Sequence, residues 1–132
     1  MKPVKVGTYE LGYERVNLFT QDDFGGRFWT LPKEGGFAEI YVGVASDNWK
    51  DVVVVLHHEA TEFALTRMNL RYNKSEKWRV DSGGYLFVFT HSEFSQAAEY
   101  AAEFMADSWD DLKKAWKKAR KHSREGDNQC TQ

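Results

Sequence analysis

The sequence predicts a single α+β domain, with short strands in the N-terminal half and helices in the C-terminal half. Residues 4–18 alternate between apolar and polar side chains, which is the period of half-buried strands. The segment 48–69 contains neither glycine nor proline and repeats apolar residues at helical spacing. With 132 residues and 42% hydrophobic content, the chain can bury one core, so we expect one domain over residues 1–121.

The N-terminal strands are predicted to form a small antiparallel meander. Turn-forming residues separate three strand-like stretches, which are residues 4–18, read as one or two strands, 27–31 and 37–44. Pro32 ends the second of these, because proline cannot donate to a strand ladder. The third is the richest in aromatic and β-branched residues and is the best strand candidate.

The segment 48–69 is predicted to be one helix, enclosed on nearly all sides. Residues 45–47 supply helix-capping side chains, and the apolar residues that follow occupy most of the helical circumference. The four valines of 52–55 locally favour a strand, because β-branched side chains lose rotamer freedom in a helix. A strand to about Leu56 followed by a helix is therefore the alternative.

A β-hairpin and two C-terminal helices are predicted next. The hairpin pairs Trp78–Val80 with Tyr85–Phe89 around a glycine turn. A capping box at Thr90–Glu93 starts the first helix, and the similar pattern at Ser108–Asp111 starts the second. The remaining residues, 122–132, are polar, so we expect a disordered tail there.

Composition sets limits on compartment and partners. The formal net charge of -2, with both signs mixed along the chain, does not favour nucleic acid as a partner. Cys130 is the only cysteine, so no intrachain disulfide can form, which favours a reducing compartment. The first residues lack the apolar stretch of a signal peptide, and the longest aliphatic run, Val52–Leu56, is soon followed by charged residues. We therefore expect a cytoplasmic protein that does not enter a membrane.

The sharpest chemical pattern is the segment His58-Glu59-Ala60-Thr61-Glu62. On a helix, His58 and Glu62 project from the same face, one turn apart, where two ligands of one metal ion could lie. Glu59 lies about 100° further round, which suits a general base acting on metal-bound water. The pattern is that of the metallopeptidase signature His-Glu-x-x-His. Glu62 replaces the second histidine, and carboxylate oxygen is an accepted zinc ligand.

A catalytic zinc ion usually has three protein ligands and one open position. His91 is the preferred third ligand, because it lies where the predicted hairpin ends and the next helix begins. Glu93 and His57 are the other candidates, although His57 points about 100° away from His58 on the helix.

Two segments resemble a known protein family. Residues 48–72 contain the pattern Trp-x6-Leu-His-His-Glu-x-x-Glu-x-x-Leu, which resembles the active-site helix of minimal zincin metallopeptidases. These small proteins are often encoded by phages and mobile elements. Residues 89–94 resemble the downstream part of such proteins, and the resemblance covers about residues 37–106.

The resemblance implies a short antiparallel sheet packed on a helix that carries the zinc site. His58, Glu62 and His91 would hold the zinc ion, and Glu59 would be the catalytic base. The implied activity is zinc-dependent hydrolysis of peptide bonds. Zincin relatives that lack the second histidine include chains without metal or activity, so the departure at Glu62 bears directly on this function.

The same residues allow a function without catalysis. Buried carboxylates cost on the order of several kcal/mol unless they are neutralised. Zinc would neutralise Glu59 and Glu62, and so would a tyrosine or one of three arginines, Arg67, Arg71 and Arg79. The chain would then be a non-catalytic interaction protein, in which the last helix, bearing Trp116, binds a protein partner or a second copy. A Glu59 or Glu62 side chain paired with arginine would favour this second hypothesis.

Overall fold

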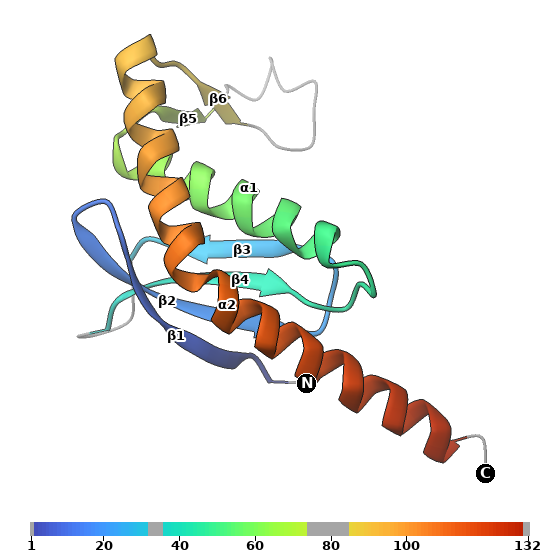
Figure 1. Cartoon of the computed structure of the whole chain (residues 1–132). Helices are drawn as coiled ribbons and strands as arrows, with labels where there is room; N and C mark the ends of the chain where they lie inside the picture. The colour runs from blue at the N-terminus through green and yellow to red at the C-terminus, as the bar shows by residue number, and fades with distance from the viewer. Residues whose placement is uncertain (1, 32–35, 74–84, 131–132) are drawn as a thin grey trace.

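A computed structural model describes residues 2–31, 36–73 and 85–130 and confirms the predicted α+β class (Figure 1). It contains a four-stranded sheet, a two-stranded sheet and two helices. The elements are β1 (Val4–Leu11), β2 (Glu14–Gln21), β3 (Gly26–Trp29), β4 (Ala38–Gly43), α1 (Trp49–Arg67), β5 (Arg71–Asn73), β6 (Tyr85–Phe87) and α2 (His91–Cys130). Neither helix in this described part of the chain is both long and apolar enough to cross a membrane.

The four-stranded sheet is mixed, and the predicted antiparallel meander is wrong at one pair of strands. Its order is β1-β2-β4-β3, and β2 runs parallel to β4 while the other two pairs are antiparallel. β4 thus lies between β2 and β3 instead of at the edge. This strand has buried residues along its whole length, and a central position surrounds it with neighbours on both sides.

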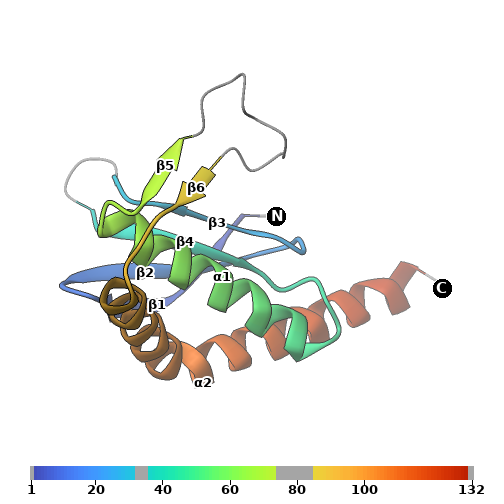
Figure 2. The ribbon, with the colours of Figure 1, turned by 90° about the horizontal axis from the view of Figure 1, so that it is seen from above.

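Both helices pack on the same face of this sheet (Figures 1 and 2). The core between them is formed by apolar side chains from β2, β4, α1 and α2. Its largest fully buried members are Phe63, Phe104, Leu18, Ile40, Leu56, Leu112, Val16, Val42 and Val52. The opposite face of the sheet carries neither of these helices.

α1 confirms the predicted central helix and excludes the strand alternative for residues 52–56. Asn48 caps it, because its side chain accepts a hydrogen bond from the backbone N–H of Lys50 at 3.0 Å. The expected enclosure on nearly all sides is wrong, since Val54, His57 and His58 are exposed. The sheet and α2 cover one side of α1. The other side faces solvent, even at the apolar residue Val54.

α2 is one helix of 40 residues, so the predicted break at Ser108 is wrong. Ser108 is fully buried, and its hydroxyl donates to the carbonyl of Phe104 at 2.8 Å instead of capping a new helix. The buried stripe continues at helical spacing from Ala97 to Leu112. The helix also includes residues 122–130, where we expected the polar tail.

The start of α2 confirms the predicted capping box. The backbone N–H of Glu93 donates to the hydroxyl of Thr90 at 3.2 Å, and the N–H of Thr90 donates to the Glu93 carboxylate at 2.9 Å.

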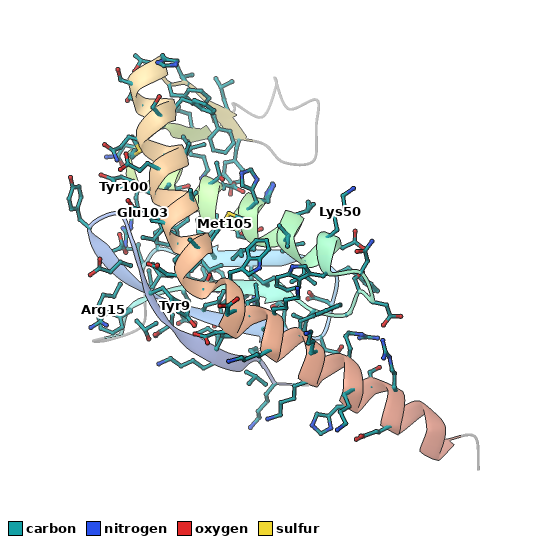
Figure 3. The ribbon with its side chains drawn as sticks, viewed as in Figure 1. Tyr9, Arg15, Lys50, Tyr100, Glu103 and Met105 are labelled. Atoms are coloured by element: carbon teal, nitrogen blue, oxygen red, sulfur yellow. The ribbon has the colours of Figure 1, made fainter. Side chains whose placement is uncertain are left out.

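Further along α2, the Tyr9 hydroxyl of β1 donates to Asp111 at 2.7 Å, with the tyrosine ring lying against the helix (Figure 3). This hydrogen bond joins the middle of α2 to β1.

The second sheet contains β5, a strand that the sequence did not predict. β6 pairs antiparallel with β5, so that Arg71 is opposite Phe87 and Tyr72 is opposite Leu86. The predicted partner, Trp78–Val80, lies outside the described residues. β5 follows α1 closely because Asn69, at φ 61°, ends the helix in the left-handed conformation that reverses the chain.

Candidate functional site

α1 brings His58, Glu59 and Glu62 together at its middle, as the helical spacing predicts. His58 Nε2 lies 3.1 Å from Glu62 Oε2 and 4.0 Å from Glu59 Oε1. The side chain of His58 is 67% exposed, whereas that of Glu59 is only 8% exposed. Successive helical residues differ by about 100° in direction, so the imidazole faces solvent while the neighbouring carboxyl group faces the sheet.

Arg71 of β5 completes the cluster, which we name the His58–Glu62–Arg71 cluster. Its guanidinium donates to Glu62 Oε1 at 3.2 Å, so the two carboxylate oxygens of Glu62 contact different side chains. The guanidinium carbon also lies 4.2 Å from the ring centroid of Tyr85 and 5.3 Å from that of Phe28. One arginine therefore links α1, β3, β5 and β6 by an ion pair and two cation–π contacts.

The Glu59 side chain packs closely against Gly26 of β3, where a larger residue would collide with it. A Cβ atom added to Gly26 of β3 would come within 2.7 Å of Glu59 Cγ and 2.9 Å of Glu59 Oε1. Burial raises the pKa of Glu59 from 4.5 to about 6; His58 opposes this rise and Glu62 adds to it. The Glu59 carboxyl group therefore changes its protonation state just below neutral pH.

The predicted third ligand, His91, and the two alternatives, Glu93 and His57, have other surroundings or other roles. His91 is the exposed first residue of α2, and His57 is exposed on α1. Glu93 caps α2 through its hydrogen bond with Thr90. Over the described ranges, no group of three or more His, Cys, Asp or Glu side chains is placed so that it could hold a metal ion. His91 is therefore not assembled with His58 and Glu62 into the predicted set of three.

The contacts of Glu62 decide whether the residues fit a zinc centre. Oε1 of Glu62 is already paired with Arg71 at 3.2 Å, so only Oε2, which faces His58, is left for a metal ion. Arg71 also carries a permanent positive charge, which repels a cation placed beside the same carboxylate. In this arrangement the described residues do not fit a three-ligand zinc site.

Three residues of the site could not be predicted from the sequence motif on α1. Gly26, Phe28 and Tyr85 come from β3 and β6, and only the fold brings them to α1. Arg71 was one of three arginines that could neutralise the carboxylates, and in the structure it is the one that pairs with Glu62.

Comparisons of the chain with known protein families, with curated proteins and with solved structures found no match.

Proposed function

We propose that the protein is a non-catalytic interaction protein, in which the His58–Glu62–Arg71 cluster has a structural role. The ion pair between Glu62 and Arg71 supports this proposal, because it neutralises a largely buried carboxylate without a metal ion. Under this proposal, the chain keeps the zincin-like fold that the resemblance to small phage or mobile-element proteins implies. An ion-pair cluster would take the place of the metal centre.

The cluster holds β5 and β6 beside α1, and exposed apolar side chains lie on these strands, just after β6 and in the first turn of α2. We name this surface the ribbon patch; its members are Tyr72, Leu86, Val88, Phe89 and Phe94. Tyr72 and Leu86 are opposite each other across the strands, and the rings of Phe89 and Phe94 stack with centroids 5.7 Å apart. Exposed apolar side chains in groups are typical of protein-binding surfaces. A protein or peptide is therefore the proposed partner.

Metal content tests the proposal directly. We expect protein purified without chelator to contain far less than stoichiometric zinc by elemental mass spectrometry. Added zinc should leave the melting temperature unchanged, because Glu62 is already paired with Arg71. Near-stoichiometric zinc that disappears in both His58→Ala and Glu62→Ala would contradict the structural role of the cluster.

Stability provides an independent test of the same cluster. Glu62→Ala should lower the free energy of unfolding by about 1–3 kcal/mol, because it leaves the partly buried Arg71 without its carboxylate partner. Glu125 is a matched control, since it forms an exposed i,i+4 pair with Lys121 on α2. Its replacement by alanine should change stability by less than about 0.5 kcal/mol. Equal effects of the two substitutions in chemical denaturation would count against the structural role.

The zinc-dependent peptide hydrolase is the second candidate function. One observation favours it: His58 Nε2 and Glu62 Oε2 lie 3.1 Å apart on one helical face, beside a carboxyl group with a pKa of about 6. That value suits a general base near neutral pH. His58, Glu62 and His91 would hold the zinc ion, and Arg71 would first have to release Glu62. Zinc-dependent peptide cleavage that is lost in Glu59→Gln would establish this function.

A further inference from the structure

The face of the four-stranded sheet opposite the helices carries an ordered row of cations and aromatic rings. Lys5 of β1 pairs with Phe19 of β2, Phe19 with Tyr41 of β4, and Tyr41 with Arg27 of β3. These four register partners lie on the outer face, because their neighbours Leu18, Ile40 and Val42 point into the core. An aromatic pair is thus flanked by one cation on each side.

Contacts within this row hold the side chains upright on the sheet. The rings of Phe19 and Tyr41 are stacked, with centroids 4.9 Å apart and an interplanar angle of 13°. The guanidinium carbon of Arg27 lies 4.3 Å from the ring centroid of Tyr41, and the Tyr41 hydroxyl donates to Glu39. The side chains of this row are therefore already ordered, so a ligand would lose little binding free energy in ordering them.

Two further aromatic rings extend the outer face beyond this row. Trp29 of β3 is 55% exposed and is opposite Glu39, and Phe37, just before β4, is also exposed. The guanidinium carbon of Arg15 lies 6.0 Å from the Phe37 ring centroid. We name the whole set the outer-face platform; its members are Lys5, Arg15, Phe19, Arg27, Trp29, Phe37 and Tyr41.

The composition of the platform indicates the chemistry of its ligand. A solvent-facing side of a sheet is normally polar, so exposed rings interleaved with cations need another explanation. Two acidic residues share this face: Glu39 accepts the Tyr41 hydroxyl, and Glu10 is opposite Arg15 in the strand register. Aromatic rings for stacking together with cations for phosphates are the combination that binds single-stranded nucleic acid.

We propose that the outer-face platform binds single-stranded nucleic acid. Bases stack on the exposed rings of Trp29 and Phe37, and Lys5, Arg15 and Arg27 pair with phosphates. This site is separate from the ribbon patch and goes beyond the proposed protein-binding function. The formal net charge of -2 is an average over the chain, whereas strand register gathers three cations on one face.

Fluorescence anisotropy of a labelled oligonucleotide of about 12 nucleotides, within the usual site sizes of such domains, tests this inference. At low salt the full chain should bind oligo(dT) or oligo(U), and Trp29→Ala should weaken binding at least fivefold, as expected for a lost stacking contact. A duplex of the same length should compete poorly, because its bases are already paired. Absence of binding by the folded wild-type chain, or equal binding of the duplex, would overturn the proposal.

Charge substitutions distinguish this platform from the basic residues of α2. Replacing Lys5 and Arg27 together by glutamine should reduce the slope of log K against log salt concentration by about 1.4. Each lost phosphate contact contributes about 0.7 to that slope. Lys117 and Lys118, both exposed on α2, provide the matched double substitution, which should leave that slope unchanged. Phe94→Ala, on α2, should likewise leave affinity unchanged. Binding that depends on the α2 lysines and not on Lys5 and Arg27 would overturn the assignment.

Discussion

Phe104→Ala is expected to lower the free energy of unfolding by about 3–5 kcal/mol, the usual cost of truncating a buried phenylalanine. The Phe104 side chain is 0% exposed and packs edge-on against Tyr9, with ring centroids 5.9 Å apart. The substitution would leave a cavity between α2 and β1, in the part of the core that both helices share. Chemical denaturation followed by circular dichroism measures the effect.

Phe94 provides the control for this prediction on the same helix. It is 50% exposed and stacks on Phe89 near the start of α2. Phe94→Ala should therefore cost no more than about 1 kcal/mol, the scale of an aromatic pair beyond its area burial. Similar losses for both substitutions would show that the middle of α2 is not packed into the core as described.

Glu59→Gln should increase stability at pH 8 and leave it almost unchanged at pH 4. The native state binds the Glu59 proton more tightly than the unfolded state, because burial raises the pKa from 4.5 to about 6. This contribution to stability is fully present below about pH 4.5 and is lost as the pH rises through 6. The shift corresponds to about 2 kcal/mol, at 1.36 kcal/mol per pKa unit. The measurement is the difference in unfolding free energy between variant and wild type at successive pH values.

Taking this difference removes the titration of groups that the two proteins share. His58 and Glu62 are the charged neighbours of Glu59, and both remain in the variant. The same difference, taken between His58→Ala and the double variant His58→Ala/Glu59→Gln, should have its midpoint at higher pH, because His58 lowers the pKa of Glu59. A difference that stays constant between pH 4 and pH 8 would refute the raised pKa.

Local signals in the sequence predicted the elements whose determinants lie within a few residues. The Thr90–Glu93 capping box was predicted because both its partners are three residues apart. The helical spacing of 48–69 likewise outweighed four valines, although Asn48 caps α1 in place of the predicted residues 45–47. Strand order was not predictable in the same way, because alternation specifies which face a side chain occupies but not which strand lies beside it.

Ser108 shows where a local signal fails. Ser108–Asp111 has the same form as the true capping box, and a cap is worth about 1 kcal/mol. Continuing the helix instead keeps Phe104 and Leu112 buried on one stripe, which contributes about 1.5–3 kcal/mol for each side chain. Burial therefore decides the outcome, and it depends on a sheet that is distant in the sequence.

The site was predictable to the extent that it lies on one helix. The contact between His58 and Glu62 follows from their i,i+4 spacing, and the structure shows it. The choice of Arg71 depends on the chain reversal at Asn69, and the fit of Glu59 against Gly26 depends on β3. Neither can be obtained from residue spacing, because both are long-range contacts set by the fold.

The packing of α2 on β1 has a consequence for synthesis on the ribosome. The hydrogen bond between Tyr9 and Asp111 joins residues 102 positions apart, and Phe104 and Leu112 cover the same side of the sheet. A nascent chain that has not yet extruded α2 exposes part of the apolar face of β1 and β2. Such exposed surfaces recruit chaperones or promote aggregation. We therefore expect translation stops between α1 and Leu112 to yield insoluble fragments.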